Sequence, residues 1–251
     1  MTKILYQQDT YLLTHTTRLL QVTLMDPKTV TVVVDETIFH PQGGGQPTDI
    51  GCIRSLKSGA CMVVDMVKLN NATGLVEHRG KMKDDLILSE GEEVILEVDE
   101  PSRKLHARLH SAGHLIHHAI QALGLPLQKT KSYHFPDSPC IECEIIDPNF
   151  DKSPVGLSSI QLKIEDLCNK WIAEGHETSI TLCQRKDMDD SRLSEKARSS
   201  EMVRFIGFNG IPNPRPCGGT HVKNVLDIGK FFIRKVASKG NAIKISYACP
   251  C

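Results

Sequence analysis

The sequence predicts an α+β protein, and three observations support this prediction. Short β-type runs fill residues 1–99, two amphipathic helical patterns follow at 101–123 and 158–172, and the last twenty residues have the pattern of a β-hairpin. Helix and strand alternate irregularly after residue 100, which favours helices packed on an antiparallel sheet. We therefore expect two domains, 1–99 and 100–251.

The N-terminal part is expected to be all-β. Runs rich in β-branched residues are separated by segments with turn chemistry, and short strands at this spacing are typical of a small barrel or sandwich. The expected strands are 29–35, 61–69, 75–78 and 93–99.

A glycine-rich segment interrupts this β region. It contains Gly43, Gly44 and Gly45, followed by Gln46. Consecutive glycines permit backbone conformations that other residues avoid, and they allow a ligand to approach the main chain closely. We expect these four residues to bind substrate.

Two helices are expected in the second part. Pro101 suits a first helical turn, apolar residues then recur at helical spacing, and Gly124 ends the pattern. The second helix is expected to begin at a cap formed by Ser158 or Ser159 and to end at Gly175. A strand at 178–183 and a hairpin of 230–237 with 242–248 complete the predicted elements.

The first helix carries histidines at metal-binding spacing. His110 and His114 lie four residues apart, so their imidazoles stand one turn above each other on one face. His106 and His118 extend the same spacing and His117 lies beside them, so spacing alone does not fix the register. The residues between His110 and His114 are small, which favours this pair as ligands and leaves the others at the surface or the core edge.

A second pair of donors lies far along the chain. Cys217 and His221 flank Gly218 and Gly219, which disfavour a helix and indicate a tight turn that runs into a strand. Glycines here also allow a bulky ligand to approach, so Gly218 and Gly219 are further expected substrate contacts. Three imidazoles and one thiolate suit zinc. The approach to the turn is stiffened by prolines at three alternate positions, Pro212, Pro214 and Pro216.

Composition limits the cellular compartment and the kinds of partner that we expect for the chain. It has 251 residues, no apolar run near the ~18 residues of a membrane span, and no signal-peptide pattern. Nine cysteines without framework spacing favour a reduced, cytosolic protein. Lys and Arg number 9 against 15 Asp and Glu in residues 1–100, and 21 against 15 in residues 101–251. The basic half therefore suits a polyanionic partner such as a nucleic acid.

Four segments together resemble the free-standing alanyl-tRNA editing proteins (AlaX type), which are related to the editing domains of alanyl- and threonyl-tRNA synthetases. The resemblance covers nearly the whole chain. It implies an N-terminal β-barrel followed by an editing domain, one zinc ion per chain, and mischarged tRNA(Ala) as partner. It also implies that the ligands are His110, His114, Cys217 and His221. The segments are 39–51, 108–115, 131–136 and 215–222.

The activity implied by this resemblance is hydrolysis of the ester in Ser-tRNA(Ala) or Gly-tRNA(Ala), with a zinc-bound water as the expected catalytic group. Thr130 resembles the family's serine-sensing threonine by its place after the helix. Four protein ligands are typical of structural zinc, whereas catalytic zinc keeps one position open. Either one ligand leaves the shell, with His221 the candidate, or the ion expands its coordination. The alternatives are a noncatalytic tRNA- or RNA-binding module with a structural zinc, and a zinc hydrolase of small esters or amides.

Overall fold

The computed structural model describes residues 1–26, 28–187 and 201–250. Two compact units, Met1–Ala107 and Arg108–Cys251, divide the chain. The boundary between these units lies within helix α1 (Glu100–Ala122). Strands and helices are both well represented, and the predicted α+β class is confirmed.

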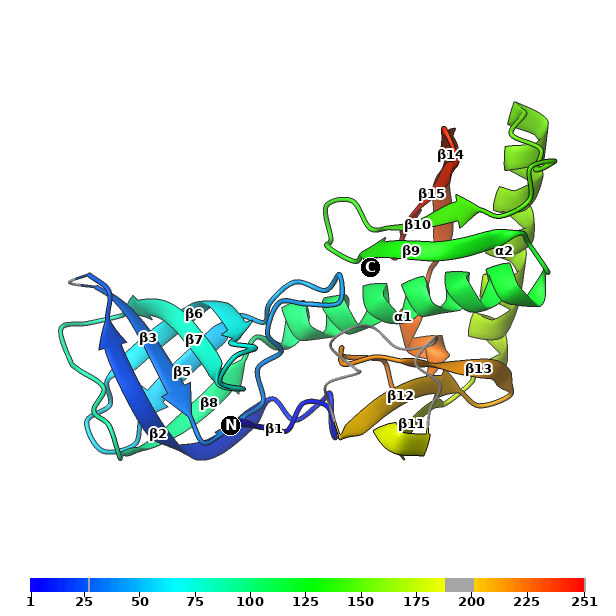
Figure 1. The fold of residues 1–251 in the computed structure, drawn as a ribbon. Helices are drawn as coiled ribbons and strands as arrows, with labels where there is room; N and C mark the ends of the chain where they lie inside the picture. The colour runs from blue at the N-terminus through cyan, green and yellow to red at the C-terminus, as the bar shows by residue number, and fades with distance from the viewer. Residues whose placement is uncertain (27, 188–200, 251) are drawn as a thin grey trace. The chain divides into compact units, whose positions relative to one another are not determined.

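The first unit contains a closed β-barrel (Figure 1). The expected strands at 29–35, 61–69, 75–78 and 93–99 are all present, and the prediction of a barrel is confirmed. Two members of the barrel, β2 and β5, were not predicted. A short parallel pair, β1 (Lys3–Ile4) with β4 (Glu36–Thr37), lies outside the barrel. The barrel order is β2 (Thr14–Leu24), β3 (Thr29–Val34), β7 (Val76–Met82), β6 (Cys61–Leu69), β5 (Gly51–Ser55) and β8 (Glu93–Val98).

Alternating side chains fill the barrel interior. Val30, Val32 and Val34 of β3 are buried, as are Met62 and Val64 of β6. Successive strand residues point to opposite sides, so this alternation is what a sheet closed around one core requires.

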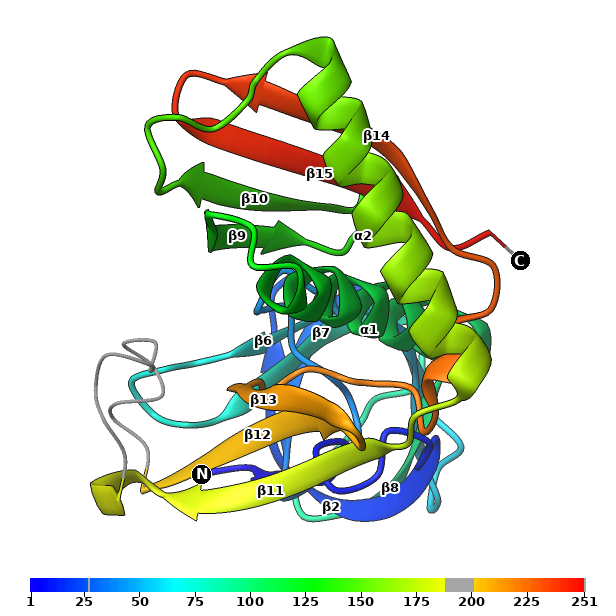
Figure 2. The ribbon, with the colours of Figure 1, turned by 90° about the vertical axis from the view of Figure 1, so that its right-hand side faces the viewer.

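The second unit places the C-terminal part of α1 between two antiparallel sheets. Figure 2 shows α1 with β9 on one side and β13 on the other. The larger sheet has the order β14 (Phe232–Lys239), β15 (Ala242–Ala248), β10 (Cys140–Ile145), β9 (Leu127–Tyr133). The smaller has the order β11 (Thr178–Gln184), β12 (Met202–Phe208), β13 (Ile211–Pro216), and β11 leads into a 3-10 turn, η1 (Arg185–Asp187). The predicted C-terminal hairpin is confirmed.

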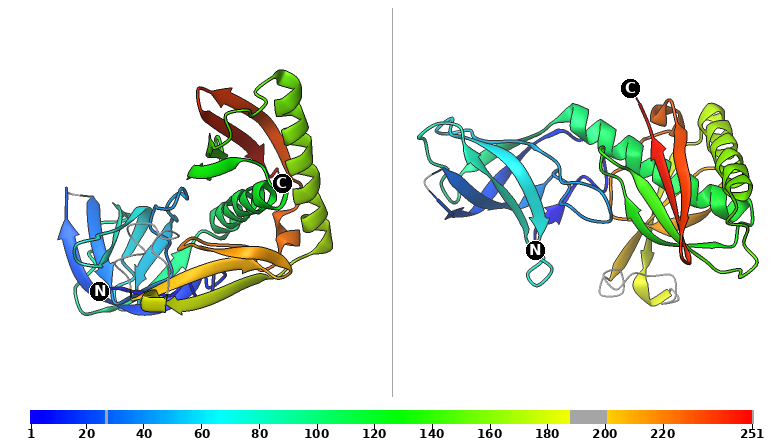
Figure 3. Two further views of the ribbon diagram at one scale, coloured as in Figure 1. Left: turned by 45° about the vertical axis from the view of Figure 1, so that its right-hand side comes forward. Right: turned by 90° about the horizontal axis from the view of Figure 1, so that it is seen from above.

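Helix α2 (Pro154–Glu174) begins earlier than we predicted. The predicted cap at Ser158 or Ser159 is wrong, because Ser153 accepts the Gly156 N–H and Pro154 occupies the first helical turn. The predicted end is confirmed: Gly175 has φ 74° and its N–H donates to the Trp171 carbonyl. The helix lies along β14 (Figure 3) and buries an apolar stripe, Ile160, Ile164, Cys168 and Ile172.

The segment with Cys217 and His221 does not run into a strand, and that expectation is wrong. It follows β13 and leads into a 3-10 helix, η3 (Val225–Ile228), whose capping box is formed by Asn224 and Asp227. The prolines before Cys217 belong to β13 itself. Because β13 is an edge strand, a residue without an N–H can face outward there without breaking the sheet.

Candidate metal centre

Four side chains of the second unit bring metal-ligand atoms together. The donors of His110, His114, Cys217 and His221 all lie within 4.8 Å of one another. The Cys217 Sγ is 3.4 Å from the Nε2 of His110 and 3.4 Å from the Nε2 of His221. In a tetrahedral zinc shell, sulfur and nitrogen ligands are separated by about 3.6 Å. The spacing thus fits four donors around one ion.

Local structure explains how distant residues meet. His110 and His114 stand one turn apart on α1, with ring centroids 5.2 Å apart. Arg204 of β12 holds the loop that carries the other pair, because its guanidinium donates to the carbonyl oxygens of Cys217 (2.8 Å) and Gly219 (3.0 Å). The backbone N–H of Gly219 also points at the Cys217 Sγ, 3.4 Å away.

Ser111 of α1 links the helix to the loop. Its hydroxyl oxygen lies 3.2 Å from the Nδ1 of His221 and accepts the N–H of Val222 at 3.1 Å. With Nδ1 directed at Ser111, the Nε2 of His221 is the nitrogen that faces Cys217. Such a hydrogen bond fixes both the ring orientation and the tautomer of a metal-binding histidine.

The electrostatics of the cluster suit a cation. Burial, followed by the field of His221, holds the pKa of His114 well below its ordinary value, so its imidazole stays neutral. Burial raises the pKa of the Cys217 thiol, against the Gly219 N–H, Arg204 and Lys129, which lower it. Among the described residues the buried Nδ1 of His114 finds no hydrogen-bond partner. Neutral imidazoles and one thiol that a cation would deprotonate match the donor set of zinc.

The other histidines of α1 lie outside the cluster. His117 accepts a hydrogen bond from Arg215 at 2.7 Å between Nε2 and Nη2, and burial with the field of Arg215 lowers its pKa to about 3. His118 is buried against Phe208, with ring centroids 5.8 Å apart. His106 belongs to the first unit.

Lys129 is a site residue that sequence reasoning missed. A β-bulge at Thr130 pairs Lys131 with Glu142 and Lys129 with Cys143, so the two lysines project to opposite faces of the sheet. Part of Lys129 is exposed, but protein surrounds its ammonium group closely enough that desolvation lowers its pKa, while Cys217 opposes this shift. Lys129 therefore adds positive charge beside the donor cluster.

Thr130 occupies the bulge and is exposed. Its hydroxyl donates to the Glu142 carbonyl at 3.1 Å. No described contact joins Thr130 to the four donors.

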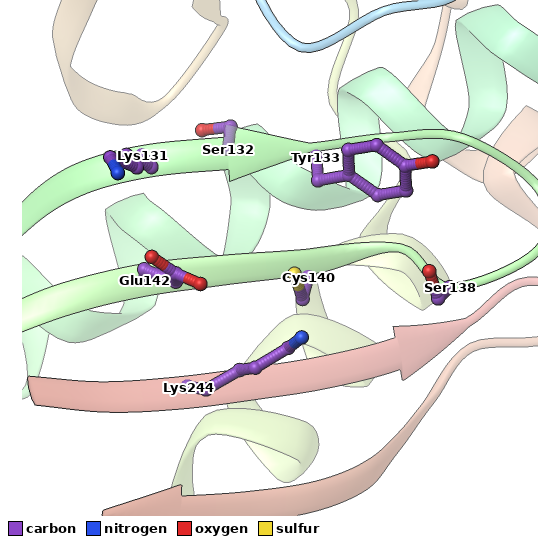
Figure 4. Close-up of a pocket in the computed structure, with 7 residues that line it drawn as sticks. All are labelled: Lys131, Ser132, Tyr133, Ser138, Cys140, Glu142 and Lys244. Atoms are coloured by element: carbon purple, nitrogen blue, oxygen red, sulfur yellow. The ribbon is translucent and has the colours of Figure 1, made fainter. Parts of the chain in front are cut away.

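The opposite face of the same sheet carries a cavity of about 350 Å³ (Figure 4). None of the four donors lines it. The lining residues are Lys131, Ser132, Tyr133, Ser138, Cys140, Glu142 and Lys244.

The glycine-rich segment lies in the first unit and forms a tight turn. Gly43 and Gln46 exchange backbone hydrogen bonds of 3.1 and 3.0 Å, with Gly44 (φ 60°) and Gly45 (φ 80°) between them. Positive φ at both central positions is the geometry that favours glycine in a two-residue hairpin turn. Gln46 is fully buried.

Family models match both units. A model described as tRNA synthetases class II (A) matches residues 5–102, and one described as threonyl and alanyl tRNA synthetase second additional domain matches residues 203–244. None of the described helices is long and apolar enough to cross a membrane.

Curated relatives match the chain over most of its length. The alanyl-tRNA editing protein AlaX-M of Methanosarcina acetivorans is 31% identical, with 98% of each chain covered. AlaX-M of Pyrococcus horikoshii is 29% identical, over 96% of this chain and 94% of that one. The alanine–tRNA ligase of Thermotoga maritima is 31% identical over 86% of this chain, which spans 24% of the ligase. The chain belongs to the AlaX-M family of alanyl-tRNA editing proteins.

Proposed function

We propose that this protein hydrolyses the ester bond of mischarged Ser-tRNA(Ala), Gly-tRNA(Ala) or both, at a site that holds one zinc ion. The convergence of His110, His114, Cys217 and His221 carries this proposal. Membership of a family whose relatives are named alanyl-tRNA editing proteins supplies the substrate class.

The need for such an activity is physical. A synthetase pocket sized for alanine cannot strongly reject glycine, which is smaller, or serine, which adds only a hydroxyl. A second site that cleaves the wrong ester corrects the error.

The residues of this chain would divide the work. The three imidazoles and the Cys217 thiolate would hold zinc, which when bound polarises a carbonyl or lowers the pKa of a water. Ser111 keeps His221 in its ligand orientation. Lys129 and Arg215 supply positive charge near the polyanionic end of a tRNA.

Thr130 is our candidate for the residue that senses serine. Its own proton is donated to the Glu142 carbonyl, so the hydroxyl oxygen remains an acceptor for the hydroxyl of a seryl group. Alanine offers no such donor. A Thr130→Val variant should lower the ratio of the Ser-tRNA(Ala) rate to the Ala-tRNA(Ala) rate by about 2- to 10-fold, the worth of one hydrogen bond.

Gly218 and Gly219 are proposed to receive the acylated end of the tRNA. Gly218 is exposed beside the donor cluster, and Gly219 lies buried within the same loop. In the first unit, the turn of Gly43, Gly44, Gly45 and Gln46 is proposed as a separate contact with the tRNA.

Deacylation assays with Ser-tRNA(Ala), Gly-tRNA(Ala) and correctly charged Ala-tRNA(Ala) test the proposal. We expect at least one mischarged tRNA to lose its amino acid well above the buffer rate while Ala-tRNA(Ala) is spared. Equal decay of all three, or no decay above buffer, would defeat it.

A noncatalytic tRNA- or RNA-binding module with a structural zinc is the second candidate. Four protein donors within 4.8 Å favour it, because closed four-ligand shells are typical of structural zinc. A His114→Ala variant separates the two candidates. Unaltered function in that variant, with loss of function on charge reversal at Lys129 and Arg215, would support the binding module.

A further inference from the structure

His134 lies against the metal-binding helix, outside the four donors. It follows β9, is 1% exposed, and its ring stacks on that of His110 with centroids 4.6 Å apart and planes 22° apart. This imidazole is therefore part of the wall of the candidate centre.

Gly113 makes room for this ring. A Cβ at position 113 would stand 2.3 Å from the Cε1 and 2.8 Å from the Nδ1 of His134. Glycine inside a helix costs about 1 kcal/mol relative to alanine. Glycine at this position, between His110 and His114, is therefore explained by packing, because it leaves space for the His134 ring.

Tyr247 fixes the tautomer of His134. The Tyr247 hydroxyl donates to the Leu109 carbonyl oxygen at 2.9 Å and lies 2.6 Å from the Nδ1 of His134. A carbonyl oxygen only accepts, so the single hydroxyl proton is used there and the short contact requires a proton on Nδ1. The neutral ring then carries its lone pair on Nε2, the ring nitrogen that does not contact Tyr247.

The surroundings favour water as the donor to that lone pair. Lys129 is the charged described group that acts on His134, and no described carboxylate does so. A cation nearby disfavours the ammonium of an aminoacyl group but not a water molecule. Hydrolysis needs an oriented water molecule. The Nε2 of the neutral His134 imidazole is the hydrogen-bond acceptor that would orient it.

Building on the proposed function, we propose that His134 is a catalytic residue whose Nε2 accepts a hydrogen bond from the attacking water, and that Tyr247 is the positioning residue that holds His134 in the required tautomer. Hydrolysis joins the water oxygen to the carbonyl carbon and breaks the bond from that carbon to the ribose oxygen. The ribose oxygen takes up one water proton, and the other stays with the released carboxylic acid, which ionises in solution. His134 sets the direction of attack.

Single-turnover deacylation of Ser-tRNA(Ala) and Gly-tRNA(Ala) by zinc-loaded variants is the first test. His134→Ala should lower the rate constant by about 100-fold, in the range of a positioned proton acceptor, with unchanged half-saturation and zinc content. His134→Gln, whose amide oxygen reaches the place of Nε2, should recover more activity than His134→Asn. Imidazole added to His134→Ala should restore part of the rate. Tyr247→Phe should slow wild type about 3- to 10-fold, yet have no further effect in the His134→Ala background.

Tyr133→Phe is the matched control, since Tyr133 adjoins His134 in sequence but lines the cavity on the other face of the sheet (Figure 4). It should keep the wild-type rate. A readout independent of activity is ¹⁵N NMR of histidine in the metal-free protein, which should show His134 protonated on Nδ1. Protonation on Nε2, or a His134→Ala rate equal to that of active wild type, would overturn this role for His134. Absence of wild-type hydrolysis of every mischarged tRNA would instead defeat the proposed function, and the NMR result would still decide the tautomer.

Discussion

Arg103 and Asp49 form a fully buried ion pair inside the first unit. The Arg103 Nε lies 3.1 Å from both carboxylate oxygens, and its terminal nitrogens donate to the carbonyls of Thr10 and Ile38 at 2.6 Å each. Asp49 in turn accepts the backbone N–H of His40. The Arg103 guanidinium thereby links the start of α1 to Ile38 and Asp49, which lie at the two ends of the glycine-rich segment.

Breaking this pair should destabilise the protein strongly. Asp49→Asn leaves a buried guanidinium without its counter-charge, and we expect a loss of about 3–5 kcal/mol in the free energy of unfolding. Urea denaturation followed by circular dichroism measures it. The control is Glu97→Gln, which removes the exposed Arg54–Glu97 pair (3.7 Å) and should cost at most about 1 kcal/mol. Equal losses in the free energy of unfolding for the two variants would contradict the stabilising role of the buried Arg103–Asp49 pair.

The glycine-rich turn should tolerate alanine at one glycine and not at the next. Gly44 has φ 60° with open space around it, so Gly44→Ala should cost about 1–2 kcal/mol from backbone conformation alone. Gly43 has no positive φ, and an added Cβ would meet only the Pro41 carbonyl oxygen at 3.9 Å. Gly43→Ala should therefore leave the melting temperature nearly unchanged. A lower rate of deacylation in that stable variant would report a substrate contact, whereas equal destabilisation by both changes would contradict the assigned turn.

The barrel should lose stability in mild acid because of His78. Burial lowers the pKa of this histidine from 6.5 to about 4, and its Nε2 lies 2.8 Å from the Thr37 hydroxyl. The unfolded chain binds the proton first, so stability is complete above pH 6.5 and falls as the pH drops towards 4. The loss should reach about 3 kcal/mol at pH 4. Urea titrations at pH 7 and pH 5 measure the slope, and His78→Gln should make it shallower; a variant with the wild-type slope would rule out this cause.

Ser111 should control metal affinity without being a ligand. Ser111→Ala removes the hydrogen bond to the His221 Nδ1 and the acceptor of the Val222 N–H. We expect zinc affinity, measured by competition with a chelator, to fall about 10- to 100-fold. Ser158→Ala on the exposed face of α2 is the control and should bind zinc as wild type does. Unchanged affinity in Ser111→Ala would show that His221 needs no such support.

Local sequence patterns predicted the elements whose signals are local. The apolar period predicted α1, while the four-residue spacing of its histidines left the register open and the small residues between His110 and His114 favoured that pair. The runs of β-branched residues predicted four of the six barrel strands. The start of α2 was missed because Ser153, Pro154 and Gly156 have loop-like composition, although together they form a helix N-terminus. Strand β9 was missed because most of its side chains are exposed, so it lacks alternation.

Contacts between distant residues could not be predicted in the same way. The side to which Lys129 projects depends on a bulge one residue long. The tautomer of His134 depends on its hydrogen bond with Tyr247, which is 113 positions away. Gly113 was visible in the sequence as a glycine within a helix, but the reason for it is the His134 ring, which the segment after β9 contributes.

Metal analysis combined with deacylation tests the central claim most directly. Wild type, Cys217→Ala and the control Cys183→Ala, whose thiol lies outside the donor cluster, would be purified identically and assayed for zinc and for hydrolysis of Ser-tRNA(Ala) and Gly-tRNA(Ala). We predict about one zinc per chain and activity in wild type and Cys183→Ala, and the loss of both in Cys217→Ala. Full zinc content and wild-type hydrolysis in Cys217→Ala would contradict the account.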